Sequence, residues 1–235
     1  MQKNSWHILS TRPLSADLIA TAAQQGIAVD TLSFIETEPT TDTWVFERIK
    51  ELATQHITAV FTSMNAVEVV AQHVDRQVAW TIYSIGDATQ KLAGQKLQNP
   101  ISGTAEYADQ LSDVIIKDGV TSVVFFCGNI RRDVLPNKLK EAGIQVDELV
   151  VYNTIETSRQ VKDHYDAILF YSPSAVRSFF AANTVPATTT LFAIGTTTAQ
   201  AIQPYTDNTI IIAEKTSKEE LVHQAIAYFS QQKKD

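Results

Sequence analysis

Short apolar segments alternate with amphipathic segments along the whole chain. The continuous apolar run at 122–126 is typical of a parallel strand covered on both faces. Apolar residues at helical spacing from Trp44 to Leu52 predict a helix over 44–54. Strands that alternate with helices indicate βαβ units and therefore an α/β protein with mostly parallel sheets.

The same periodicities assign the remaining elements. Strands are predicted at 7–10, 29–35, 58–62, 80–85, 100–103, 122–126, 146–152, 167–171, 191–194 and 210–213. Helices are predicted at 15–25, 44–54, 63–74, 87–93, 105–117, 129–142, 175–182, 197–202 and 218–231.

The chain also matches itself at two different offsets. FTSMNAV at 61–67 returns as FYSPSAV at 170–176, and IGDAT at 85–89 returns at the same offset as IGTTT at 194–198. GIAVD, which begins at Gly26, returns at a longer offset as GIQVD, which begins at Gly143. The order of the matched segments requires two copies of one α/β unit, with one copy inserted into the other.

We therefore expect two similar domains, each a mostly parallel five-stranded sheet flanked by helices. The first comprises 1–36 and 160–235, the second is 41–152, and a two-stranded linker, formed by 36–40 and 152–160, joins them. Two domains of ~110 residues are each large enough to bury a core. Ligands of such sheets bind beyond the carboxyl ends of the strands, so we expect the site in a cleft between the domains.

Composition excludes several classes of function. The net charge of −7 and the dispersed basic residues argue against nucleic-acid binding. No apolar run approaches the ~20 residues that span a bilayer, and we expect no secretory signal before the first strand. The single cysteine, Cys127, fits a reducing cytosol, so we expect a cytoplasmic protein. The five histidines show no metal-ligand spacing, so no metal is expected.

The recurring motifs lie at strand ends or in the helical turn that follows. They are FTS at 61–63 with AV at 66–67, IGDAT at 85–89, FCGN at 126–129 with RR at 131–132 and LP at 135–136, VVY at 150–152, YSPS at 171–174, and IG at 194–195 with TTA at 197–199. In this order, and with the nested repeat, the chain resembles the uroporphyrinogen-III synthase family from 11–13 to 213–214.

That resemblance implies two flavodoxin-like domains and an enzyme that needs no cofactor. Its expected substrate is hydroxymethylbilane, a linear tetrapyrrole with eight carboxylates. The reaction closes this chain with inversion of ring D, through a spirocyclic intermediate and with loss of water, and gives uroporphyrinogen III. We expect no nucleic-acid or membrane partner, and a monomer because one chain carries both halves of the cleft.

The resemblance also implies which side chains act. Tyr152 matches a family tyrosine often assigned a catalytic role, although its ring could simply pack beside the linker. Thr89 and Thr198 hold equivalent places in the two units, and functional threonines map onto both and onto Thr197. The alternative is a first-turn hydroxyl that satisfies a free backbone N–H. Cys127 is interpreted as a packing thiol rather than a nucleophile.

Further candidates for substrate binding lie in the same loops. Ser63 and Ser172 are expected to cap helices, whose N-termini attract carboxylates. Arg12 and Arg131, in corresponding loops, could pair bidentately with acetate or propionate groups, and Arg132 is a weaker candidate of the same kind. The other candidates are Asn129, which could equally be a helix cap, and the glycines Gly86, Gly128 and Gly195.

Two other classes of protein share this architecture. A non-enzymatic two-lobed binding protein closes on a small ligand by hinge motion, but such proteins are usually exported. A sugar-nucleotide transferase also pairs two α/β units. It would normally show a diphosphate-binding loop, and neither GxGxxG nor GxxxxGK[ST] is present.

Overall fold

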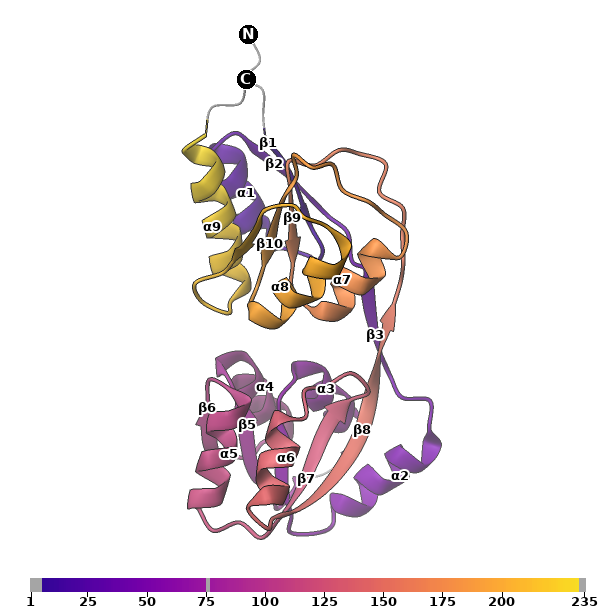
Figure 1. The fold of residues 1–235 in the computed structure, drawn as a ribbon. Helices are drawn as coiled ribbons and strands as arrows, with labels where there is room; N and C mark the ends of the chain where they lie inside the picture. Colours follow the sequence, from indigo (N-terminus) through magenta and orange to yellow (C-terminus); the bar gives the residue numbers. More distant parts are fainter. Residues whose placement is uncertain (1–5, 75–76, 233–235) are drawn as a thin grey trace. The chain divides into compact units, whose positions relative to one another are not determined.

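The computed structural model describes residues 6–74 and 77–232, whose strands form two sheets (Figure 1). The chain divides into two compact units. The first joins Met1–Glu36 to Ile155–Asp235, and the second is Thr37–Thr154, inserted between those two segments. Each expected linker contains one of these division points.

The sheet of the first unit is parallel in every pair recorded for the described residues. Its spatial order is β11 (Ile210–Ile212), β10 (Thr190–Ala193), β9 (Ala167–Phe170), β1 (Trp6–Ser10) and β2 (Ile27–Thr31). Helices α1 (Ala16–Gln24) and α9 (Lys218–Ser230) cover one face, while α7 (Pro173–Phe180), α8 (Thr196–Ile202) and the short 3₁₀ turn η1 (Gln203–Tyr205) belong to the other (Figure 1). Consecutive residues Ile8 and Leu9 enter these two different cores, as strand geometry requires.

The inserted unit has a six-stranded sheet, one strand more than expected. Its order is β3 (Ile35–Pro39), β8 (Gln145–Glu156), β7 (Ser122–Gly128), β4 (Thr58–Phe61), β5 (Thr81–Ile85) and β6 (Ile101–Ala105). Helices α2 (Thr43–Leu52), α3 (Met64–Gln72) and α4 (Asp87–Leu97) pack on one face, and α5 (Ala108–Lys117) and α6 (Val134–Glu141) on the other. None of the helices described could cross a membrane, because none is both long and apolar enough.

Spatial strand order agrees with the nested repeat. Counted from β1, the first sheet runs second, first, third, fourth, fifth. The parallel strands of the inserted unit run in the same order when the count starts at β7 and β8 and continues with β4, β5 and β6. The two units are thus built alike, with the chain entering the inserted unit at a different strand.

The second strand spans Ile27–Thr31 rather than 29–35, and parts of both linkers, predicted at 36–40 and 152–160, form strands. The chain leaves β2 at Thr31 and resumes as β3, while β8 continues to Glu156. Thr157 N donates to Phe34 O at 2.9 Å, and Thr40 N donates to Val151 O at 3.0 Å. β3 therefore pairs with β8, and Pro39 is tolerated because β3 is an edge strand.

The helix predicted at 129–142 begins late, at Val134. Asn129 N donates to Tyr152 O at 3.1 Å, so this residue continues the pairing with β8 instead of capping a helix. Pro136 gives the physical reason for the late start, because proline is tolerated in the first turn of a helix but not in its interior. Asn129 is therefore not a helix cap.

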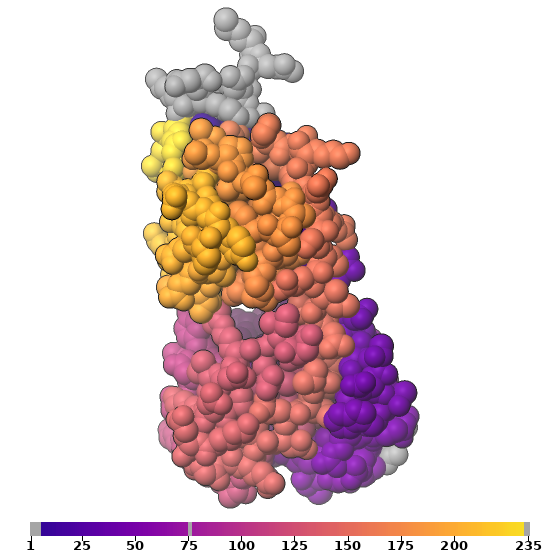
Figure 2. All heavy atoms as spheres, turned by 45° about the vertical axis from the view of Figure 1, so that its right-hand side comes forward, coloured from indigo at the N-terminus to yellow at the C-terminus, as the bar shows by residue number. Residues whose placement is uncertain are grey.

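The packed face of α2 also differs from the prediction. Val45, Ile49 and Leu52 are buried, whereas Trp44 is 60% exposed. These buried residues follow the spacing i, i+4, i+7, which places them on one face of the helix. Figure 2 shows α2 (purple) against β8 (salmon). Arg48 Nη2 of α2 lies 3.3 Å from Asp147 Oδ2 of β8.

Candidate functional site

Each unit gathers its predicted site residues at the carboxyl edge of its own sheet. In the inserted unit they follow β4, β5 and β7, and Tyr152 lies in β8 opposite the end of β7. In the first unit they follow β1, β9 and β10. Parallel strands end at the same edge, which explains the grouping. The structure therefore brings the candidates together as two groups, one in each unit.

The glycine-to-threonine turns of the two units have the same pattern of exposure. Thr89 is 8% exposed and Thr198 is 1% exposed, although both lie in the first turn of a helix. The residue before each is exposed, and in the first unit this is Thr197. Burial favours a packing role for the side chains of Thr89 and Thr198, and leaves Thr197 and the turn's backbone better placed to contact a ligand.

The glycines that precede these turns differ in backbone conformation. Gly86 has φ 61°, a left-handed conformation that side chains disfavour. Gly195 has extended backbone with φ −177°, and an added Cβ there would meet nothing within 4 Å. The backbone therefore requires glycine at position 86 but not at position 195.

The predicted serine caps are confirmed. Ser63 Oγ accepts from Asn65 N at 3.2 Å at the start of α3, and Ser172 Oγ accepts from Ala175 N at 3.2 Å at the start of α7. Ser172 Oγ also lies 3.0 Å from Ser174 Oγ. Both hydroxyls satisfy first-turn amides of their helices, which fixes the direction of the neighbouring N–H groups.

Arg12 and Arg131 have different surroundings despite their corresponding loops. Arg131 is bound by Glu148 of β8 and lies 3.7 Å from Asp133. Arg12 is exposed, and no carboxylate pairs with it in the part of the chain that the structure describes. Arg12 therefore keeps its donors available for an anion, whereas Arg131 must leave Glu148 to bind one.

Glu148 joins Arg131 to Lys140, whose Nζ lies 2.7 Å away. Burial alone would raise the pKa of Glu148, but hydrogen bonds from Lys140 and Arg131 outweigh it, so the pKa lies below its ordinary value of 4.5. A carboxylate with a lowered pKa stabilises the fold above pH 4.5, and this contribution is lost as the pH falls through the folded-state pKa.

Glu148→Gln should therefore destabilise the inserted unit in a pH-dependent way. We expect the free energy of unfolding to fall by about 1 kcal/mol at pH 7, with the difference from wild type shrinking at lower pH. Urea denaturation at pH 7 and pH 3 measures this, with the exposed Glu68→Gln as control. A difference that persists at pH 3 would contradict a role for the ionised carboxylate.

Tyr152 lies in β8 and is 9% exposed. Among the described residues no hydrogen bond is made by its hydroxyl. The neighbouring residues Gly128 and Asn129 keep the end of β7 joined to β8, since Asn129 Oδ1 accepts a hydrogen bond from Thr154 N at 2.8 Å. The ring is packed while its hydroxyl has no hydrogen-bond partner among the residues that the structure describes, a combination suited to a group that meets a ligand.

A group of apolar residues and one tyrosine at these edges were not among the predicted site residues. The first is apolar and exposed, in the loops and helix starts after β4, β6 and β7: Met64, Tyr107, Ile130 and Val134. The second is Tyr171, whose hydroxyl accepts from Ser10 Oγ at 3.2 Å and whose pKa burial raises to about 12. Apolar residues in loops directly after strands were the available signal for the first set.

Cys127 is a packing thiol, as predicted. It is buried at the end of β7, and burial raises its pKa to about 11, with a smaller opposing effect from Arg131. A thiol that stays protonated at neutral pH is a poor nucleophile.

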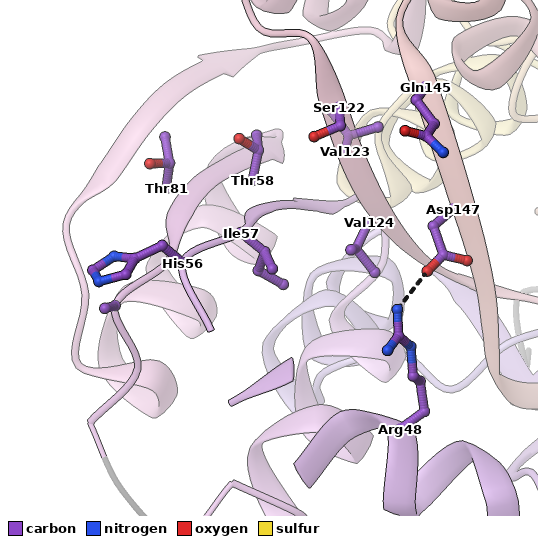
Figure 3. A pocket seen from close by; sticks show the side chains of 11 residues that line it. Arg48, His56, Ile57, Thr58, Thr81, Ser122, Val123, Val124, Gln145 and Asp147 are labelled. Atoms are coloured by element: carbon purple, nitrogen blue, oxygen red, sulfur yellow. Dashed lines mark hydrogen bonds and ion pairs between the residues drawn. The ribbon is translucent and has the colours of Figure 1, made fainter. Parts of the chain in front are cut away.

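Two pockets lie away from the predicted residues. One of about 370 Å³ opens where β4, β5, β7 and β8 begin, and Thr58, Thr81, Ser122 and Gln145 line it (Figure 3). Figure 3 shows Arg48 turned toward Asp147 there rather than into open space. The second, of about 480 Å³, lies beside Tyr165 and Phe179 of the first unit. Neither contains a predicted site residue.

Comparison with known proteins identifies the family. The family model described as "Uroporphyrinogen-III synthase HemD" matches residues 16–223. The chain belongs to the uroporphyrinogen-III synthase family. Membership agrees with the resemblance seen in the strand-end motifs and with the mostly parallel α/β fold.

Individual members of the family are similar to different extents. The uroporphyrinogen-III synthase of Saccharomyces cerevisiae is 34% identical over an alignment of 88 residues, which covers 33% of this chain and about a third, 32%, of that relative. The crystal structure of the Helicobacter pylori enzyme has a TM-score of 0.68 at 19% identity, covering 95% of this chain and 99% of the other. A mutant of the Thermus thermophilus enzyme has a TM-score of 0.65 at 15% identity, covering 98% and 100%. These two structures share the fold.

Proposed function

We propose that this chain is a uroporphyrinogen-III synthase, a lyase that converts hydroxymethylbilane into uroporphyrinogen III and water. The observation that carries the proposal is the family match over 16–223, nearly the whole chain. It disfavours the alternative of a non-enzymatic binding protein.

An acidic chain must bind a substrate with eight carboxylates through local donors. The serine-capped first turns of α3 and α7 direct backbone N–H groups outward, where the helix dipole favours anions. Thr197 and Arg12 are exposed at the same edge of the first unit. We assign carboxylate binding to these groups, to the backbone of the turns from Gly86 to Thr89 and from Gly195 to Thr198, and to Arg131 once it is released from Glu148.

The rings of the substrate need a different surface. Pyrroles linked by methylene bridges are flat and apolar, and they gain free energy when they contact apolar side chains. Met64, Ile130 and Val134 are more than two-fifths exposed at the carboxyl edge of the inserted unit. We assign ring contact to these residues, beside the donors that hold the acetate and propionate groups.

The reaction needs the protein mainly to position the substrate and to supply one proton to the leaving hydroxyl. Electrons from a pyrrole nitrogen expel the terminal hydroxyl, which leaves as water after it gains a proton. The resulting azafulvene is attacked by the substituted carbon of ring D. The spirocyclic intermediate then fragments and recloses, and loss of one ring proton restores the proton balance. Tyr152 is assigned to donate to the leaving hydroxyl, or to order a water there.

An isomer assay tests the proposal. Freshly made hydroxymethylbilane closes without an enzyme to the uninverted isomer I, so isomer III above the blank reports catalysis. The purified chain is incubated with this substrate, the products are oxidised, and the isomers are separated by chromatography. We expect isomer III as the main product. Isomer I alone, at the rate of the blank, would refute the proposal.

Arg12→Gln should weaken substrate binding more than turnover. Loss of a charge-assisted hydrogen bond to a carboxylate is expected to raise KM about tenfold, with kcat changed less than twofold. Arg12→Lys should lie between, because it keeps the charge but loses the bidentate geometry. The control is Lys50→Gln, on α2, where Lys50 Nζ lies 3.0 Å from Glu47. An Arg12→Gln enzyme with wild-type KM would exclude Arg12 from the site.

A further inference from the structure

We propose that Gly128 is a positioning residue for Tyr152. Gly128 was expected to contact substrate; its surroundings instead indicate that it acts by seating the tyrosine ring. The inference rests on the proposed function, because Tyr152 is the group assigned to the reaction. It deepens that assignment by identifying what aims the hydroxyl.

The first observation is a change of register beside Tyr152. Strands β7 and β8 pair in step from Ser122 opposite Gln145 to Cys127 opposite Val150. The register then shifts by one residue, so that Gly128 lies opposite Tyr152 and Val151 is the extra residue. Bulges of this kind change the direction of a side chain and are common next to active sites.

The second observation is the face on which Tyr152 packs. Leu149 and Val151 belong to the core beneath α2, α3 and α4, while Val150 packs in the core on the α5 and α6 face. Strict alternation would send Tyr152 to the side of Val150. Tyr152 instead packs with Val151, so the bulge has moved the ring from one face of the sheet to the other.

The third observation is the space in which the ring sits. A Cβ on Gly128 would lie 2.5 Å from Cζ and 2.8 Å from the hydroxyl oxygen of Tyr152. No side chain fits there without displacing the ring. The backbone needs no glycine at this position, because Gly128 is not among the residues with positive φ. Glycine is therefore required at position 128 to leave room for the Tyr152 ring, and in particular for the end of the ring that carries the hydroxyl.

A side chain at position 128 should lower the turnover rate by displacing the Tyr152 hydroxyl. A displacement of about 1 Å in a catalytic group can lower turnover by up to about 10²-fold. A methyl group at position 128 pushes on the atoms nearest the hydroxyl, so it should change turnover more than substrate binding. Asn129 keeps the backbone of the two strands joined, through its amide N–H to Tyr152 O and its Oδ1 to Thr154 N. A methyl group at position 128 should therefore displace the Tyr152 ring rather than the strand backbone.

The same sheet offers a matched control. Gly103 lies opposite Tyr83 at another register shift, and a Cβ there would lie 2.6 Å from the Tyr83 ring. The hydroxyl of Tyr83 donates to Asp118 at 2.8 Å and has no assigned part in the reaction. Gly103→Ala thus makes the same kind of clash in the same unit, without touching the group that is assigned to chemistry.

The experiment measures kcat, KM and the urea midpoint for Gly128→Ala and Gly103→Ala. We expect both changes to lower the midpoint, but only Gly128→Ala to lower kcat, by about tenfold or more, with KM changed less than twofold. In a Tyr152→Phe background, Gly128→Ala should lower kcat less than twofold further, because the hydroxyl it misplaces is gone. Equal losses in the two backgrounds would overturn the proposal, as would a Gly128→Ala enzyme with wild-type kcat.

A folding failure is also informative. If Gly128→Ala does not fold, the same change in a Tyr152→Leu background should fold, because the ring that it meets is absent. Failure of that double variant, where Tyr152→Leu alone folds, would show that something other than the ring requires glycine and would overturn the proposal. A wild-type protein that forms only isomer I would refute the proposed function instead, so the two failures are distinguishable.

Discussion

Tyr152→Phe is expected to lower kcat for formation of uroporphyrinogen III by about 10²-fold, the lower range for loss of a general acid. The hydroxyl is absent from every hydrogen bond recorded within the described residues, so its removal leaves no partner unsatisfied in the free protein. KM should change less than twofold, because the ring remains and the carboxylates are held elsewhere. Initial rates of isomer III formation at saturating hydroxymethylbilane measure the effect.

A competing account predicts a different result. In that account the enzyme supplies no proton donor, and positioning and backbone amides alone carry the reaction. Turnover unchanged in Tyr152→Phe would establish that account and exclude Tyr152 as proton donor. Tyr83→Phe is the control, since it also removes one hydroxyl from the inserted unit and breaks a bond to Asp118. It should lower stability and leave kcat unchanged.

The architecture could be predicted because the repeat is a property of the sequence itself. Motifs such as IGDAT and IGTTT mark equivalent places in two units, and their order alone indicates that one unit is inserted in the other. The course of the linkers could not be predicted in the same way. Glu36 to Pro39 is polar and contains proline, and it forms a strand only because β8 supplies its hydrogen bonds. Such pairing is set by tertiary structure, not by local preference.

Among the candidate site residues, too, those set by local sequence could be predicted and those set by tertiary contacts could not. The caps at Ser63 and Ser172 depend on neighbours two or three positions away, so the sequence predicts them. The difference between Arg12 and Arg131 depends on Glu148, which is distant in sequence and is brought near Arg131 by the pairing of β7 with β8. The seating of Tyr152 on Gly128 depends on a one-residue bulge, for which the sequence carries no local signal.

Phe126→Ala should have the largest effect on stability, lowering the free energy of unfolding of the inserted unit by about 3–5 kcal/mol. Phe126 is 0% exposed and stacks on Phe61 at 5.1 Å and on Trp80 at 5.6 Å between ring centroids. Truncation removes this burial and leaves a cavity that β-strands on both sides cannot collapse to fill. Trp44→Ala, at the exposed position in the same unit, should change stability by less than about 0.5 kcal/mol.

Hydrogen exchange followed by mass spectrometry locates the effect of Phe126→Ala. Each unit has its own cores, so a two-unit chain need not unfold in one transition. Amides of β4 and β7 should lose protection, while those of β9 and β10 in the first unit keep it. Equal loss in both units would contradict independent unfolding. Because β7 carries Gly128 and pairs with the strand of Tyr152, isomer III formation should fail at the temperature where β7 loses protection, even while the first unit is still folded.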